Sequence, residues 1–286
     1  MTVLLAHHAG FCWGVRRVVQ LAEDQARTHT RPVYTFGPLI HSNAVIERLT
    51  QHGIRVIPPD ADDAALARLE PDALIIIRAH GVPPHATARL QQAGFALVNG
   101  TCPHVEKIQR LIADAHQAGR TVFILGDAKH AEVIGLLGFC NERGHVLHSA
   151  AADLPNLPPT APITVVAQST LDATTFTALV GAITAYFINV IVEDTRCNAT
   201  SRTQAEAREL CARVAAMVVI GDRHSANTNR LEQICRECGA RTFHVENADD
   251  LLPGDFAGCA TVGVTAGSST PDWLIAAVIT RLESFR

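Results

Sequence analysis

Three cysteines share one local setting, and that setting restricts the possible folds more than any other feature of the chain. Cys12, Cys102 and Cys197 each follow a short apolar run typical of a strand, and each precedes a stretch with helical character. They are 90 and 95 residues apart, so no local hairpin can join them. Only a fold that arranges three similar units around one centre can bring these thiols together.

The setting of these cysteines also favours metal binding. A thiol between a strand and a helix meets free backbone N–H groups and the positive end of the helix dipole, and both favour the thiolate, the form that binds metals. Three thiolates fit an iron–sulfur cluster that normally takes four, which leaves one iron open for a substrate. For any one of the three cysteines taken alone, a buried structural thiol is the more common role.

The other five cysteines fit a structural role better. Cys235 and Cys238 have C-x-x-C spacing, but they fall in one predicted helix, Arg230 to Gly239, and the sequence contains no second pair of this kind. Zinc and thioredoxin-like sites need more context than that. We therefore expect both to lie away from the metal centre. The remaining cysteines are Cys140, Cys211 and Cys259.

Composition argues against several classes of protein. Hydrophobic residues make up 48% of the 286 residues and charged residues 18%, which provides for a large core and does not indicate disorder. The net charge of −4, with scattered Lys and Arg, argues against nucleic acid as the main partner. No apolar run approaches the ~20 residues that span a bilayer, so no membrane partner is expected. The first twenty residues lack a secretion pattern, and with eight cysteines this predicts a cytoplasmic protein.

Short apolar runs alternate with helical patterns along the whole chain. Such alternation predicts an α/β fold built on mainly parallel sheets. Together with the cysteine spacing, it suggests three similar α/β units with approximate bounds 1–101, 102–196 and 197–286. We leave open that the N-terminal strand pairs with a unit other than the first. The predicted strands are 3–5, 33–35, 74–78, 95–98, 121–125, 163–167, 187–192, 217–220 and 261–264.

Histidines and a carboxyl lie in loops after the predicted strands, where parallel sheets bind ligands. His41, His80 and His130 occur in such loops, and Glu132 follows a strand–Gly–Asp loop. Protonated imidazoles can hold an anion, and a carboxyl in this place can act as a general acid. From spacing alone, a general acid and an ordinary surface carboxylate are equally open for Glu132.

Hydroxyl and amide side chains mark two further loops. Ser225 and Asn227 open one predicted helix, and Ser269 precedes another. Exposed N–H groups, hydroxyls and an amide at a helix start can bind an anion. Taken alone, each of the two serines is more simply a helix N-cap.

With these motifs in view, the chain resembles the 4-hydroxy-3-methylbut-2-enyl diphosphate (HMBPP) reductase family. The resemblance runs nearly from end to end, and so many motifs in one order are highly specific. The matching segments are Gly10–Val15, Gly37–His41, Ala79–Val82, Thr101–Pro103, Gly126–Glu132, Gln168–Thr170, Cys197–Thr200, Ser225–Leu231 and Gly263–Ser269.

The resemblance implies a fold and a cofactor. Three α/β units would form a cloverleaf around a central [4Fe-4S] cluster, held by the residues that match Cys12, Cys102 and Cys197. The open iron would bind the substrate hydroxyl, and loss of this exposed iron would leave a [3Fe-4S] form. We expect a ferredoxin or flavodoxin as the electron donor, because no dinucleotide-binding Gly-x-Gly-x-x-Gly follows a strand.

The resemblance also implies a reaction and a set of site residues. An allylic diphosphate takes up two electrons and two protons, loses its hydroxyl as water, and becomes isopentenyl or dimethylallyl diphosphate. The carboxyl that matches Glu132 delivers protons, and His130 is the second catalytic candidate. The substrate-binding candidates are His41, His80, His130, Ser169, Ser225, Asn227 and Ser269.

Several positions depart from the family pattern near the implied cavity. Loss of one hydroxyl contact costs about 0.5–1.5 kcal/mol when its partner stays solvated, so weakened binding is expected before lost chemistry. Two alternatives stay open: a paralogue that reduces a related allylic diphosphate, and a non-catalytic iron–sulfur sensor. Retention of His41, Glu132 and Asn227 speaks against the sensor. The departures are Ser42, Ala131, Ile134, Ser169, Thr203 and Ala226.

Overall fold

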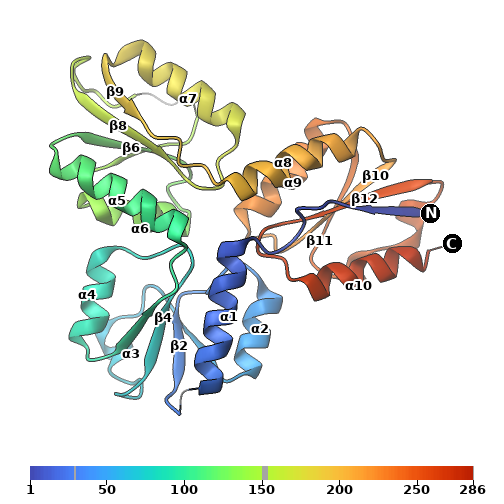
Figure 1. The fold of residues 1–286 in the computed structure, drawn as a ribbon, viewed down its shortest axis with the longest axis horizontal. Helices are drawn as coiled ribbons and strands as arrows, with labels where there is room; N and C mark the ends of the chain where they lie inside the picture. The colour runs from blue at the N-terminus through green and yellow to red at the C-terminus, as the bar shows by residue number, and fades with distance from the viewer. Residues whose placement is uncertain (29, 150–153, 286) are drawn as a thin grey trace. The chain divides into compact units, whose positions relative to one another are not determined.

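Strands and helices alternate along the protein, as the apolar runs predicted. The computed structural model describes residues 1–28, 30–149 and 154–285. The strands of these ranges form three sheets, each of four parallel strands (Figure 1). The prediction of three similar α/β units is therefore confirmed.

Sheets B and C share one strand order. In each sheet, the first strand in chain order has the second strand on one side, and this second strand forms one edge. The third strand lies on the other side of the first, and the fourth strand forms the opposite edge. Sheet B runs β3–β2–β4–β5, with β2 Val33–Phe36, β3 Arg55–Ile57, β4 Leu74–Ile77 and β5 Ala96–Asn99. Sheet C runs β7–β6–β8–β9, with β6 Thr121–Leu125, β7 His145–Leu147, β8 Pro162–Ala167 and β9 Asn189–Val192.

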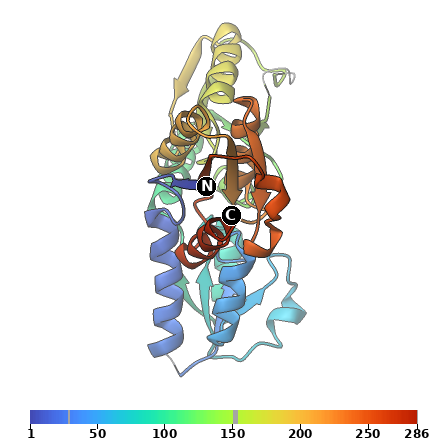
Figure 2. The same cartoon turned by 90° about the vertical axis from the view of Figure 1, so that its right-hand side faces the viewer.

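Sheet A repeats this order, and the N-terminal strand completes it. Strand β1, Thr2–Leu5, pairs with β12, Thr261–Ala266, and lies beside the strands of sheet A in both views (Figures 1 and 2). It takes the place that β5 and β9 take in the other two sheets. The N-terminal strand therefore pairs with the last α/β unit of the chain. Strands β10, Ala216–Ile220, and β11, Arg241–Val245, complete sheet A.

Each of the three cysteines singled out above follows the strand in this fourth place. Cys12 comes after β1, Cys102 after β5 and Cys197 after β9. The helices that follow them are α1 Trp13–Thr28, α5 Pro103–Gln117 and α8 Asn198–Cys211. The predicted position of each cysteine between a strand and a helix is confirmed.

Helices cover the sheets through apolar faces. In α5, Val105, Ile108 and Ile112 are buried at helical spacing and pack against Val122 and Ile124 of β6. No helix of the described ranges combines the length and apolar character that crossing a membrane requires. The remaining α-helices are α2 Asn43–Gln51, α3 Asp63–Leu66, α4 Pro84–Gln92, α6 Ala131–Leu137, α7 Ala173–Tyr186, α9 Ala226–Glu237 and α10 Asp272–Glu283. Short 3₁₀ helices are Gly138–Cys140, Ala248–Asp250 and Pro253–Phe256.

The sequence prediction missed one strand in each sheet, and all three are edge strands. They are β3, β7 and β11, which contain charged or polar residues such as Arg55, His145 and Arg241. An edge strand is buried on fewer sides than a central one and so carries a weaker apolar signal. In contrast, every residue of the central strands β4 and β10 is buried.

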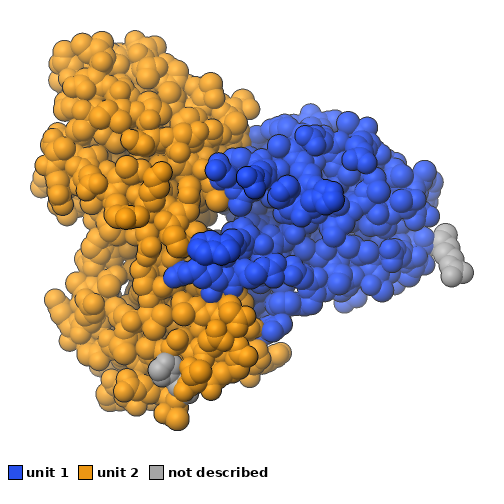
Figure 3. Space-filling view, in the orientation of Figure 1, with its two compact units in different colours: residues 1–17, 40–48, 198–286 blue, residues 18–39, 49–197 orange. Residues whose placement is uncertain are grey.

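The chain divides into two compact units by its internal contacts (Figure 3). Unit 1 comprises residues 1–17, 40–48 and 198–286 and contains sheet A, whereas unit 2 comprises residues 18–39 and 49–197 and contains sheets B and C. The boundaries near residues 102 and 197, expected from the cysteine spacing, stay predictions.

Candidate functional site

Cys12 lies in unit 1, directly before α1. Its backbone N–H donates a hydrogen bond to the carbonyl of Ser268, in the loop after β12 (3.3 Å). The N–H of Val15, in the first turn of α1, donates to the Cys12 sulfur (3.5 Å). The half-buried thiol thus meets a helix N-terminus, as its sequence setting predicted.

Cys102 occupies the equivalent place in unit 2, as the N-cap residue of α5. Its backbone N–H donates to the carbonyl of Ala79, next to His80 (3.0 Å). Burial raises the pKa of the Cys102 thiol, whereas the N–H groups of His104 and Val105 lower it. The N–H groups at the helix start thus favour the Cys102 thiolate as predicted, but burial is the larger effect, so metal binding would have to release the proton of this thiol.

Cys197 and Cys102 lie within electrostatic range of each other in unit 2. The Cys197 backbone N–H donates to the carbonyl of Ser169, in the loop after β8 (2.8 Å). Negative charge on Cys197 and on Glu132 raises the pKa of the Cys102 thiol. Unit 2 therefore brings together two of the three predicted metal ligands and the predicted acid.

Glu132 is buried at the start of α6, with 1% of its surface exposed. Ser169 donates twice to its carboxylate: the backbone N–H to Oε1 and the hydroxyl to Oε2, both at 2.6 Å. Burial raises the pKa of Glu132, although the two Ser169 bonds and nearby His104 lower it. A carboxyl with a raised pKa can still hold a proton near neutral pH, which is what a general acid requires.

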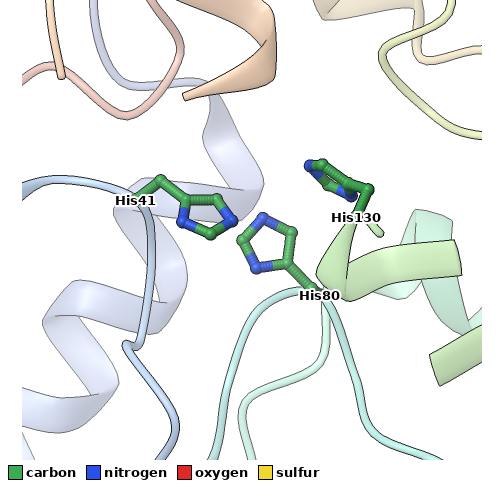
Figure 4. A group of neighbouring side chains, drawn as sticks. All are labelled: His41, His80 and His130. Carbon is green, nitrogen blue, oxygen red and sulfur yellow. The ribbon is translucent and has the colours of Figure 1, made fainter. Parts of the chain in front are cut away.

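His80 and His130 lie edge to face in unit 2 (Figure 4). Their ring centroids are 5.5 Å apart, with an angle of 88° between the ring planes. His130 is the N-cap of α6, and its Nδ1 accepts from the backbone N–H of Glu132 (3.2 Å). Next to His80, Gly81 has φ +71°, and a Cβ there would lie 2.3 Å from Nε2 of Gln109. The positive φ favours glycine at this turn, and a side chain there would also require Gln109 to move.

Ser225, Asn227 and Ser269 meet at the N-terminus of α9 in unit 1. The Ser225 hydroxyl oxygen accepts from the N–H of Thr228 (3.3 Å) and from the Ser269 hydroxyl (3.4 Å). Ser225 is thus an N-cap as well as a candidate ligand-binding residue. Ser269 is not, because Pro271 occupies the N-cap position of α10.

Asn227 is also buried in this cluster, with 3% of its surface exposed. Its amide nitrogen donates to the Ser268 hydroxyl oxygen (3.4 Å). Within the described ranges, its Oδ1 is buried and has no hydrogen-bond partner. Buried polar groups are rarely left in this state, so a bound group that donates a hydrogen bond would complete the bonding of this amide oxygen.

The predicted site residues fall into both compact units. His41 is half-buried in unit 1, in the segment before α2. The unit 1 residues are Cys12, His41, Ser225, Asn227 and Ser269, and the unit 2 residues are His80, Cys102, His130, Glu132, Ser169 and Cys197.

Two of the departures from the family pattern, Ser169 and Thr203, make side-chain hydrogen bonds. Ser169 supplies the hydroxyl that holds Glu132. The Thr203 hydroxyl donates to the carbonyls of Ala199 (3.1 Å) and His8 (3.3 Å), and so connects α8 to the segment before Cys12. Both departures therefore have local structural roles.

Sequence reasoning missed two residues that shape the site in unit 2. The Thr195 hydroxyl accepts from the N–H of Ala167 and donates to its carbonyl, both at 2.7 Å, which fixes the segment before Cys197 to the end of β8. His104 Nε2 lies 2.7 Å from the Thr195 carbonyl oxygen and connects the start of α5 to that segment. His104 could have been found from its place two residues after Cys102, whereas no local pattern marks Thr195.

Cys235 fits the structural role predicted for it. It is fully buried among apolar side chains of unit 1, and this burial raises the pKa of its thiol far above the ordinary value. Cys238 follows at the C-cap of α9 and is exposed.

Thiols and a buried acid at the ends of parallel strands are typical of a metal-dependent α/β enzyme. Comparison with known proteins identifies the family within this class. The model of the family described as LytB protein matches residues 3–283. The chain therefore belongs to the LytB protein family.

Curated relatives match the chain over nearly its full length. The 4-hydroxy-3-methylbut-2-enyl diphosphate reductase of Geobacter sp. (strain M21) is 42% identical, over 99% of this chain and 98% of its own. The reductase of the same name from Aquifex aeolicus (strain VF5) is 36% identical, over 98% of this chain and 96% of its own.

Solved structures agree with these relatives. A structure of (E)-4-hydroxy-3-methyl-but-2-enyl diphosphate reductase, described as the terminal enzyme of the non-mevalonate pathway, is 35% identical, covers 99% of each chain and has a TM-score of 0.72. A Plasmodium falciparum reductase structure, at 21% identity, shares the fold with a TM-score of 0.92, over 99% of this chain and 88% of its own.

Proposed function

We propose that this chain is an iron–sulfur reductase that converts HMBPP into isopentenyl and dimethylallyl diphosphate. The observation that carries this proposal is the buried carboxyl of Glu132, held by Ser169 within electrostatic range of Cys102. A non-catalytic metal protein would have no use for a protonatable group there. Family membership and the names of the curated relatives support the same activity.

The donor set fits an iron–sulfur cluster. Cys12, Cys102 and Cys197 would hold it, since each thiol is partly accessible and none forms a disulfide. When bound, the cluster supplies two electrons to the substrate, one at a time, and an iron with an open coordination position. The cluster form, [4Fe-4S] or [3Fe-4S], and a cytoplasmic location are parts of this proposal.

The residues of unit 2 would handle protons. Burial raises the pKa of Glu132, and in its protonated form this carboxyl would donate a proton toward the reacting carbon. His130 shares its loop through the bond from the Glu132 N–H, so it would orient the substrate or act as a second proton donor. His80 lies beside His130 and would hydrogen-bond the substrate.

The residues of unit 1 would hold the diphosphate. Ser225, Asn227 and Ser269 gather at the N-terminus of α9, where the helix dipole favours negative charge. We assign His41 to the same role, because a protonated imidazole adds a positive charge for the anion.

Turnover by the anaerobically reconstituted protein tests this proposal. With reduced methyl viologen as the electron source, HMBPP should give isopentenyl and dimethylallyl diphosphate. Asn227→Ala should raise KM about tenfold or more without changing the visible spectrum of the cluster, because it removes a charge-assisted hydrogen bond worth about 1.5–3 kcal/mol. An unchanged KM would contradict the diphosphate role.

The same assay separates the two alternatives. A paralogue would turn over a related allylic diphosphate faster than HMBPP, and the departures Ala226 and Ser42 are the positions at which to look for the cause. A sensor would hold the cluster and turn over no allylic diphosphate.

A further inference from the structure

The only two tryptophans of the sequence, Trp13 and Trp273, both lie on the surface of unit 1. Trp13 is 69% exposed and Trp273 is 41% exposed. Aromatic residues make up only 5% of the chain. Two large aromatic side chains left in water therefore suggest a surface that another molecule covers.

Contacts around Trp273 connect several of these exposed groups. The Phe11 ring lies edge to face with it, at 6.3 Å between centroids and 81° between planes. The Arg48 guanidinium lies over the Trp273 ring, 4.6 Å from its centroid. Arg16 lies over the Phe11 ring, 6.0 Å from its centroid, and forms an ion pair with Asp272 (3.2 Å).

Helix α1 adds Trp13 to this group. Trp13, Arg16 and Arg17 occupy positions i, i+3 and i+4 of the helix and so share one face. We call the following set the Trp13 patch: Phe11, Trp13, Arg16, Arg17, Arg48 and Trp273.

We infer that the Trp13 patch is the docking surface for a small acidic electron-carrier protein, an inference that rests on the proposed reductase function. The patch carries three arginines and is bordered by Asp272, so it is positive on a chain of net charge −4. Such a positive surface attracts an acidic partner. Tryptophan and arginine are also the residues most enriched among those that contribute most binding energy.

The position of Cys12 explains why the carrier should bind here. Cys12 is a proposed cluster ligand and stands between Phe11 and Trp13 in the chain. A carrier on the Trp13 patch is therefore next to a ligand of the acceptor, with no intervening domain to cross.

The electron balance requires such a partner. Two reduced carriers each give one electron, and two protons are taken up. The C–O bond to the substrate hydroxyl breaks, and the oxygen leaves as water with one of the protons. The second proton forms a C–H bond of the product, and both carriers leave oxidised.

Fluorine NMR tests binding without any turnover. Protein labelled with 5-fluorotryptophan gives one resonance each for Trp13 and Trp273, assigned with Trp13→Phe and Trp273→Phe. Addition of oxidised flavodoxin, an acidic carrier, should shift or broaden both resonances, and raising the salt concentration should reverse the effect. Two unchanged resonances would overturn the inference.

Kinetics with two electron sources test the role in catalysis. Arg16→Glu combined with Arg48→Glu should raise KM for reduced flavodoxin or ferredoxin at least tenfold. The rate with reduced methyl viologen should not change, because that small reductant needs no docking surface. Arg213→Glu, a charge reversal at an exposed position of unit 1 outside the patch, is the matched control and should leave both rates unchanged.

The outcomes are distinguishable from failure of the proposed function. If methyl viologen drives no turnover in the unmodified protein, the reductase proposal fails, whereas the NMR result still decides carrier binding. If flavodoxin supports turnover and the Arg16→Glu, Arg48→Glu double variant changes the KM for flavodoxin less than twofold, the docking inference is wrong.

The docking inference is also wrong if both tryptophan resonances shift with protein concentration alone, since the patch then binds a second copy of the chain. If the double variant loses its cluster, the kinetic test is repeated with Arg48→Glu alone, because Arg48 is farther from Cys12 in the sequence than Arg16.

Discussion

At the scale of single residues, the most informative group is the Glu132 carboxyl. Ordinary carboxyls in proteins face water and are ionised at neutral pH, whereas this one is buried and accepts two bonds from a single serine. The two Ser169 bonds oppose the effect of burial on its pKa but do not outweigh it. A group of this kind is costly to fold, and function is the ordinary reason for keeping one.

Replacement of the acid tests its catalytic role. Glu132→Gln keeps the volume: its amide oxygen can accept from the Ser169 N–H, and its amide nitrogen can donate to the Ser169 hydroxyl oxygen, which reverses that bond. The substitution removes the transferable proton. We expect normal iron content and turnover lower by roughly two or more orders of magnitude, the usual range for a lost general acid. The check is single-turnover kinetics, and near-normal rates would move the acid role to His130.

The pH dependence of stability tests the burial of the same group. Because the folded-state pKa of Glu132 is raised above 4.5, the unfolded chain releases this proton first as the pH rises. The free energy of unfolding should therefore fall above that pH, by at most about 1.4 kcal/mol per pH unit, until the folded-state pKa is passed. Glu132→Gln lacks this contribution, so its stability relative to the unmodified protein should increase from pH 5 to pH 8. Urea unfolding of both proteins at the two pH values is the measurement, and a constant difference between them would contradict a raised pKa.

At the scale of the elements, the strand ends decide where the reactive groups lie. Strand β8 provides an example, because its last residue, Ala167, is bound at both its N–H and its carbonyl by the Thr195 hydroxyl. Cys197 lies two residues after Thr195, and its backbone N–H donates to the carbonyl of Ser169. One side chain thus fixes the whole segment that presents a proposed metal ligand.

Removal of that hydroxyl should loosen the segment. Thr195→Val keeps the shape but leaves two buried backbone groups without partners, at a cost of roughly 1–3 kcal/mol. We expect a lower melting temperature and less iron per chain after reconstitution. Thr195→Ser keeps the hydroxyl and should behave nearly as the unmodified protein. If Thr195→Val binds a full complement of iron, the segment does not depend on this bond.

At the scale of the whole molecule, the proposed cluster ligands belong to both compact units. Cys12 is in unit 1, whereas Cys102 and Cys197 are in unit 2. A group that binds only the folded chain raises its stability, so chelation of iron should lower the melting temperature by several degrees. Cys12→Ser should lose most of the iron and show the same low melting temperature. Cys238→Ser, a change at an exposed thiol, should keep both the iron and the stability. Full iron content in Cys12→Ser would remove that residue from the ligand set.

Much of the fold was predictable because buried parallel strands have a strong local pattern. The sequences of β4, β6 and β10 are almost wholly apolar, so each can be recognised as a buried strand from at most five residues. The edge strands β3, β7 and β11 were missed because a strand with an open edge need not be apolar.

The sequence by itself determined the chemistry of this protein: which thiols follow strands, which carboxyl follows a strand–Gly–Asp loop, and which hydroxyls open a helix. These are local relations, since a strand end or a helix start is made by neighbouring residues. Only the tertiary structure decided the relations between distant segments. It placed β1 in sheet A and formed the hydrogen bonds between Thr195 and Ala167 and between Ser169 and Glu132. It also decides the pKa of the Cys102 thiol, on which burial has a larger effect than the helix N–H groups. Burial and long-range hydrogen bonding depend on packing between distant parts of the chain, and the residues around one part do not indicate which other part it will contact.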